Sequence, residues 1–329
     1  MSDLVRVVEA AYALEGASTS EWLTGVADAA RTELGFEDGI IAYTYDVRHD
    51  GWITPHDVAL ASATPEIAAD LLNPGAFPPT ETAAVLHVHM TSGVGLATRI
   101  SAASGEGSVG RAYFQRVLGA RGFADALTIN AVDPTRNGCL FFVPVRREPK
   151  LVPRLRARYA KLSAHMAAGF RLRRAVGALT DEAVLAPNGK VAHADGAAKS
   201  GAARESLRDA VRALDRARGK LRKRDPEGAL EAWRGLVSGR WSLVDRFDAD
   251  GRHFIIAHPN EPDAPDPRAL TPRERQVAGY VALGQSNKTI AYELGISPST
   301  VGVLVARALE KLGLKSRTSL AAAFTPKLP

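Results

Sequence analysis

The sequence has almost no cysteine and no long apolar segment. Cys139 is the only cysteine among 329 residues, so the chain cannot form an internal disulfide, which fits the reducing cytoplasm. The longest apolar run, 139–145, is far shorter than the roughly 20 residues that span a bilayer. The first residues also lack the basic start and apolar core of a signal peptide. We therefore predict a cytoplasmic protein without a membrane partner.

Recognisable catalytic and metal-binding patterns are also absent. Residues 105–110 have the spacing of a dinucleotide-binding loop, but no buried strand precedes them. Ser108 lacks the glycine two residues earlier that a nucleophile elbow requires. His87 and His89 would share one face of a strand, but the spacing identifies no third metal ligand. We predict no enzyme and no metal site, and leave the cofactor unknown. His87, His89 and Trp52 are candidate ligand-binding residues, with ordinary packing or surface positions as the alternative.

The excess positive charge lies at one end of the sequence. The chain has 42 Lys and Arg against 36 Asp and Glu, a net charge of +6. Residues 268–329 have nine basic and three acidic side chains, which is also +6, so residues 1–267 are neutral. A basic segment of this kind predicts contact with a polyanion such as DNA.

The chain length predicts two or three domains. Four prolines between Pro259 and Pro267 indicate a stiff, extended linker, which we place at 259–269. Strand and helix signals alternate before the linker, and we divide them into regions 1–176 and 177–258. A fourth segment, 270–329, follows the linker.

Both regions before the linker contain signals for paired strands. In the second region, Asn188-Gly189 and Asp250-Gly251 are typical of hairpin turns. The first region contains two expected strand pairs and a following helix: 40–47 with 52–61, 126–132 with 140–145, and 152–175.

Residues 270–329 contain the start and stop signals of several short helices. Thr271-Pro272-Arg273-Glu274 is a capping box with proline at the first helical position. Ser286 precedes a second helix, Ser297-Pro298 begins a third, and Gly313 ends it. One face of the third helix is apolar at helical spacing. That face consists of Val301, Leu304, Val305, Ala308, Leu309 and Leu312.

The order of these residues resembles a LuxR-type helix-turn-helix. The resemblance implies that the outer face of the third helix enters the major groove of double-stranded DNA. Gly302, Leu304 and Ala306 stand where the family often has Lys, His and a further cation, so we expect phosphate contacts to dominate. The candidate base contacts are Ser299, Thr300, Gly302, Val303, Ala306 and Arg307. The candidate phosphate contacts are Lys288, Arg307, Lys311, Lys315 and Arg317.

The regions before the linker resemble two sensor folds. The element order of 1–176 resembles a GAF domain and that of 177–258 a PAS domain, which implies a small-molecule or protein effector and a homodimer. The predicted fold class is therefore multidomain α+β: GAF-like and PAS-like antiparallel sheet domains followed by an all-α helix-turn-helix domain. The predicted function is a DNA-binding transcriptional regulator. The alternative is a protein-interaction or scaffold module whose helix-turn-helix has lost specific base readout.

Overall fold

The computed structural model describes most of the chain, which forms two compact units. One unit consists of Met1–Gly35 and Ala168–Asp266, and the other of Phe36–Ala167 and Pro267–Pro329. The described residues are 3–14, 18–47, 53–73, 93–102, 109–132, 137–175, 181–237, 241–247, 251–259, 270–282, 286–294 and 296–324.

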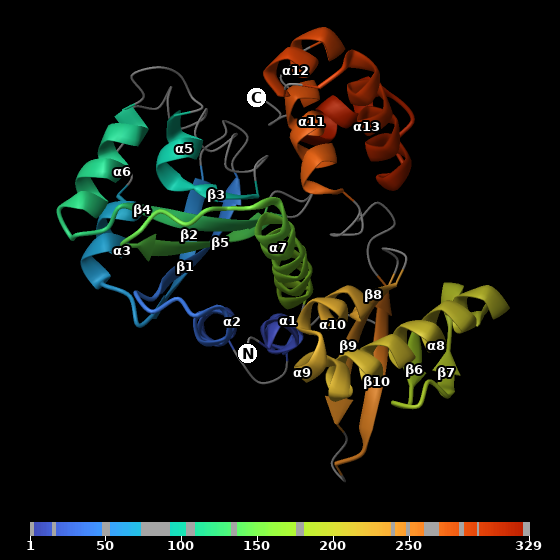
Figure 1. Cartoon of the computed structure of the whole chain (residues 1–329). Coiled ribbons are helices and arrows are strands. Elements are labelled where there is room, and N and C mark those ends of the chain that lie inside the picture. Colours follow the sequence, from blue (N-terminus) through green and yellow to red (C-terminus); the bar gives the residue numbers. More distant parts are fainter. Residues whose placement is uncertain are drawn as a thin grey trace. The chain divides into compact units, whose positions relative to one another are not determined.

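A five-stranded antiparallel sheet lies within Phe36–Ala167 (Figure 1). Its strand order is β2-β1-β5-β4-β3, and both predicted strand pairs are confirmed by the pairing of β1 with β2 and of β4 with β5. The strands are β1 (Ile40–Val47), β2 (Ile53–Ala61), β3 (Val94–Leu96), β4 (Asp125–Val132) and β5 (Asn137–Val145).

Three helices cover one face of this sheet. They are α3 (Pro65–Leu71), α5 (Ala97–Ala102) and α6 (Val109–Gly119). Tyr43, Phe114 and Phe142 belong to the buried apolar cluster between these helices and the sheet. The predicted helix after β5 is α7 (Pro153–Arg174), and the Ser163 hydroxyl donates a hydrogen bond of 2.6 Å to the carbonyl oxygen of Asn130.

The second sheet lies between residues 183 and 259 and has the same strand order as the first. Its order is β7-β6-β10-β9-β8. If the strands of each sheet are numbered from one to five, both orders become 2-1-5-4-3. Both expected hairpins are confirmed, because β6 pairs with β7 and β9 with β10. The strands are β6 (Ala183–Leu185), β7 (Val191–Ala194), β8 (Leu236–Val237), β9 (Trp241–Phe247) and β10 (His253–Pro259).

A long helical segment connects the two hairpins of this sheet. The last helix of this segment, α10, ends at Ala232. The segment is kinked at Gly219, whose backbone angles are not helical. Its parts are α8 (Gly201–Arg216), the kinked stretch Ala217–Leu221, α9 (Arg222–Arg224) and α10 (Pro226–Ala232).

The first two helices of the chain belong to the same unit as the second sheet. They are α1 (Leu4–Tyr12) and α2 (Thr19–Leu34), and a capping box between Ser18 and Glu21 starts α2. The Arg222 guanidinium forms ion pairs with Asp3 at 2.6 Å and with Glu9 at 3.1 Å. This grouping crosses the bounds 1–176 and 177–258, which remain a prediction.

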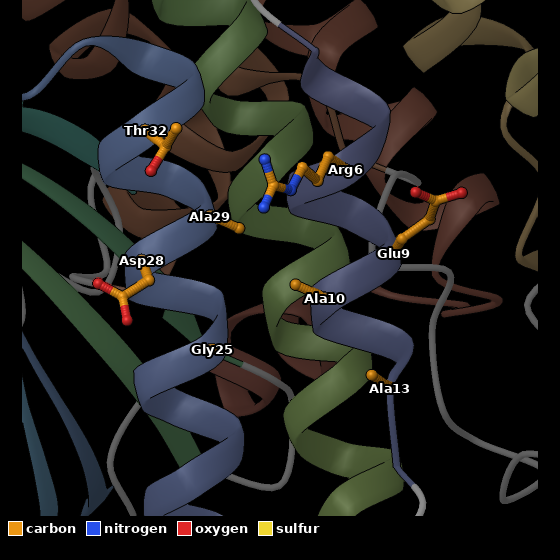
Figure 2. Close-up of a pocket in the computed structure, with 8 residues that line it drawn as sticks. All are labelled: Arg6, Glu9, Ala10, Ala13, Gly25, Asp28, Ala29 and Thr32. Atoms are coloured by element: carbon orange, nitrogen blue, oxygen red, sulfur yellow. The ribbon is translucent and has the colours of Figure 1, made fainter.

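An open groove of about 420 Å³ runs between α1 and α2. Figure 2 shows Ala10 of α1 and Ala13, directly after this helix, on one side, and Gly25 and Ala29 of α2 on the other. A Cβ atom at Gly25 would have no atom within 4 Å. The glycine therefore leaves space that a larger side chain could fill.

Gly25 and Gly169 allow a test of the packing of α1, because both are helical glycines but their surroundings differ. A Cβ atom at Gly169 in α7 would lie 2.1 Å from the carbonyl oxygen of Ala11. We expect Gly169→Ala to lower the free energy of unfolding by about 1–3 kcal/mol through overpacking. Gly25→Ala, the matched control, should raise it by about 1 kcal/mol through helix propensity. Urea unfolding of the full chain measures both, and a stabilised Gly169→Ala variant would contradict the contact between α7 and α1.

Candidate nucleic-acid interface

The C-terminal domain starts with the capping box that the sequence predicts. The Thr271 amide donates to Glu274 Oε2 at 2.7 Å, and the Glu274 amide donates to Thr271 Oγ1 at 3.2 Å. These reciprocal bonds satisfy two backbone donors at the start of α11 (Pro272–Ala282). The capping box is confirmed.

Three further helices complete this domain (Figure 1, orange and red). They are α12 (Asn287–Leu294), α13 (Pro298–Lys311) and α14 (Arg317–Phe324). All four helices contribute to one buried apolar cluster. The fully buried members are Val277, Ala278, Val281, Ile290, Ala291, Val301, Ala308 and Leu320.

Both predicted ends of α13 are confirmed. Ser297 is the N-cap, and its hydroxyl oxygen accepts the Thr300 amide at 3.1 Å. At the other end the Leu314 amide donates to the carbonyl oxygen of Leu309, and the Gly313 amide to that of Glu310. These two bonds form a Schellman motif. Gly313 has a φ angle of +64°, the left-handed conformation that favours glycine.

The two faces of α13 differ in burial as the apolar spacing predicts. Val301, Val305 and Ala308 are buried in the domain core, and Leu304, Leu309 and Leu312 pack against it. The opposite face is open to solvent, and Val303 has 49% of its surface exposed. The exposed candidates on this face are Ser299, Thr300, Val303, Ala306 and Arg307. Gly302 is half-buried.

The five candidate phosphate contacts fall into two groups. Lys288, Arg307 and Lys315 are exposed. The other two form contacts within the domain: Lys311 Nζ donates to Glu274 Oε2 at 2.7 Å, and Arg317 Nη1 donates to Asn287 Oδ1 at 2.8 Å. Their side chains therefore connect α13 to α11 and α14 to α12.

Residues 268–324 match the model of the family described as bacterial regulatory proteins, luxR family. The C-terminal domain is a LuxR-type helix-turn-helix. The chain is 39% identical to the transcriptional regulatory protein FixJ of Rhizobium meliloti over 93 residues, which are 26% of this chain and 46% of that protein. It is 56% identical to the transcriptional regulatory protein UhpA of Salmonella typhimurium over 52 residues, 16% of this chain and 26% of that protein.

The sequence similarity to the curated relatives covers only part of each of them. The nitrate/nitrite response regulator protein NarL of Escherichia coli is 37% identical over 101 residues, 31% of this chain and 46% of that protein. The chain thus spans less than half the length of these curated relatives. The solved structure of Escherichia coli SdiA covers 96% of this chain and 94% of that chain at 12% identity, with a TM-score of only 0.30.

The other candidate sites of the sequence lie outside the described residues. These are His87, His89 and Trp52, the proposed ligand-binding residues. Within the described ranges no group of three His, Cys, Asp or Glu side chains could hold a metal ion. No described helix is long and apolar enough to cross a membrane.

Glu274 has a second role in the LuxR-type domain that the sequence did not indicate. Only 3% of its side chain is exposed. Burial raises the pKa of this carboxyl group, but the hydrogen bonds from Lys311 and from the Thr271 amide outweigh burial. The net result is a pKa below the ordinary value of 4.5. The capping box predicted Glu274 as a helix start, whereas its pairing with a lysine 37 residues away has no local signal.

Gly302 has room for a side chain in spite of its half-buried position. A Cβ atom there would meet Asn287 Nδ2 at 3.7 Å, which is an ordinary van der Waals distance. The glycine is therefore not required by packing. It lowers helix stability by roughly 1 kcal/mol relative to alanine.

The Glu274–Lys311 pair predicts an acid-sensitive domain. Because the folded pKa of Glu274 is lowered, its stabilisation is complete above pH 4.5 and is lost as the pH falls through the folded pKa. Glu274→Gln should lower the free energy of unfolding by about 1–3 kcal/mol at neutral pH and remove this part of the pH dependence. Gln still permits the capping box.

Urea unfolding of the full chain, from neutral pH to about pH 3, measures this effect. Glu310→Gln is the matched control, because Glu310 is an exposed carboxyl group on α13. Equal pH dependence in Glu274→Gln and the unchanged protein would disprove the role of the pair.

Proposed function

We propose that this protein is a transcriptional regulator that binds double-stranded DNA through its LuxR-type domain. The observation that supports this most directly is the division of α13 into two faces. The inner face is packed in the domain core and the outer face is open to solvent. In helix-turn-helix proteins the corresponding face enters the major groove.

We propose that exposed cations around α13 hold the domain on the phosphate backbone. Lys288, Arg307 and Lys315 are free to contact phosphates, and each contact releases counterions. The ammonium group of Lys311 has three donors, so it can contact a phosphate while it remains bonded to Glu274. Arg317, whose guanidinium donates to Asn287, remains a proposed phosphate contact.

We propose that the protein acts as a homodimer under the control of an effector. Two copies of α13 about 34 Å apart would then contact two half-sites, with α14 near the dimer interface. The GAF-like region 1–176 and the PAS-like region 177–258 would bind a small molecule or a protein. Their antiparallel sheets, each with helices beside it, are compatible with this role. The proposed compartment is the cytoplasm.

The rival function is an interaction module with a helix-turn-helix fold. Two observations favour it: α13 has Gly302 and Ala306 on its outer face, and Lys311 is engaged with Glu274. In that case the exposed face of α13 would bind a protein instead of DNA. Titration with random-sequence duplex at two salt concentrations distinguishes the two functions, because only DNA binding weakens with salt as phosphate contacts require.

Substitution of the exposed lysines tests the phosphate contacts. Lys288→Gln combined with Lys315→Gln should weaken binding to every duplex sequence alike. The slope of log affinity against log salt concentration should fall by about 0.9 for each lost contact. Lys190→Gln is the control, because Lys190 is exposed but belongs to the second sheet region. A slope that does not change would exclude both lysines as phosphate contacts.

A cation at position 302 tests the orientation of α13. Gly302→Lys should tighten binding to duplex DNA, because the new side chain has room to leave the helix surface and adds a positive charge near the groove. Gly302→Ala separates the charge from the gain of about 1 kcal/mol in helix propensity. Fluorescence anisotropy with random-sequence duplex measures the affinity. Weaker binding by Gly302→Lys than by Gly302→Ala would contradict the proposed docking of α13.

A further inference from the structure

The outer face of α13 has few groups that can distinguish bases by hydrogen bonds. Gly302, Val303 and Ala306 have no side-chain donor or acceptor. Ser299 and Thr300 have hydroxyl groups, and both are hydrogen-bonded to Ser297 Oγ, at 2.7 and 2.8 Å. Serine and threonine hydroxyls also bond to more than one kind of base. Hydrogen bonding from this turn therefore provides little discrimination.

Arg307 is the one strong donor among the candidate base contacts, but it lies far along the helix. It is eight residues after Ser299, which corresponds to about 12 Å along the helix axis. The residues that touch base edges in helix-turn-helix proteins are those at the start of the helix. This position favours a phosphate contact for Arg307.

Val303 has the exposed apolar surface that the other candidates lack. Among the described residues of the LuxR-type domain it is the one large hydrophobic side chain that is exposed, at 49%. Ala306 lies one turn further on the same face and is also exposed, while Gly302 has no side chain to cover the valine. A helical valine is held almost entirely in one rotamer, so its methyl groups have a fixed direction and lose little entropy on contact.

Only one base presents an apolar group in the major groove. Thymine presents a C5-methyl group beside its O4 acceptor, whereas the other three bases have no methyl group there and present hydrogen-bond donors and acceptors. A hydrogen-bond donor of a base that lay against Val303 would lose its hydrogen bonds to water and gain none from the valine, which is unfavourable. The thymine methyl has no such cost, and its burial against Val303 is favourable.

We propose that Val303, with Ala306 beside it, is the residue that determines base specificity, and that it selects thymine through its C5-methyl group. This inference rests on the proposed DNA binding by the LuxR-type domain. It identifies the preferred target as a half-site with thymine opposite Val303.

Two duplexes that differ only in this methyl group test the inference. One is an alternating A·T duplex of about 20 base pairs, two helical turns, and the other has uracil in place of every thymine. The full chain is titrated with each duplex at one low salt concentration by fluorescence anisotropy. We expect the thymine duplex to bind about fourfold more tightly for each methyl group buried.

Variants at position 303 assign the difference to the valine. Val303→Ala should bind the two duplexes with nearly equal affinity, and Val303→Thr, which retains one methyl group, should keep part of the preference. Glu310→Gln, at an exposed position of the same helix, should keep all of it. Any effect of uracil on the shape of the duplex would change the affinity of the Val303→Ala variant equally. A shape effect therefore cannot produce a preference for thymine that depends on Val303.

The outcomes separate this inference from the proposed function. If the full chain binds both duplexes equally, or if Val303→Ala retains the whole preference, then selection of thymine by Val303 is wrong while DNA binding stands. If the full chain binds neither duplex even at low salt, both proposals are wrong.

Discussion

Burial of the apolar side of α13 determines which of its residues can reach another molecule. Val301, Val305 and Ala308 are enclosed by α11, α12 and α14, so rotation of α13 about its axis would expose these side chains. Full exposure would cost about 1.5–3 kcal/mol for each of the buried Val301 and Val305, and less for Ala308. That cost holds Ser299, Gly302, Val303 and Ala306 on the outer side. The composition of the outer face then decides what the domain can bind.

The outer face of α13 has few hydrogen-bonding side chains, and basic side chains lie around it. Positive charge near α13 is the feature that we propose attracts DNA without regard to sequence, and the exposed Val303 is the side chain that we propose adds discrimination. The Glu274–Lys311 pair affects both the stability and the surface charge of the domain. It connects the end of α13 to the start of α11, and it partly neutralises the positive charge of Lys311. A single buried carboxyl group thus contributes to the stability of the domain and to the charge of its surface.

In the unit that contains the second sheet, arginine side chains also connect segments that are distant in sequence. Arg222 holds Asp3 and Glu9 of the N-terminal segment, and Arg218 contacts both Glu9 and Asp245. These side chains are only partly exposed, so water screens the ion pairs less than at an open surface. Charged contacts therefore join the first helix of the chain to the helical segment beside the second sheet.

The sequence by itself determined the features that depend on neighbours three or four residues apart. The cap at Thr271, the N-cap at Ser297, the stop at Gly313 and the apolar face of α13 are all local, and each is present in the structure. The strand pairs also followed from local patterns and turns. The four-helix LuxR-type domain and most of its exposed face could be predicted in this way.

Only the tertiary structure decided the contacts between distant residues. The pairing of Glu274 with Lys311 spans 37 residues, and that of Asp3 with Arg222 spans 219. The sequence does not show whether a charged side chain forms an ion pair. The partner depends on which distant residues the fold brings together, and not on spacing along the chain. For that reason the bond of Lys311 to Glu274 and that of Arg222 to Asp3 could not be predicted from the sequence.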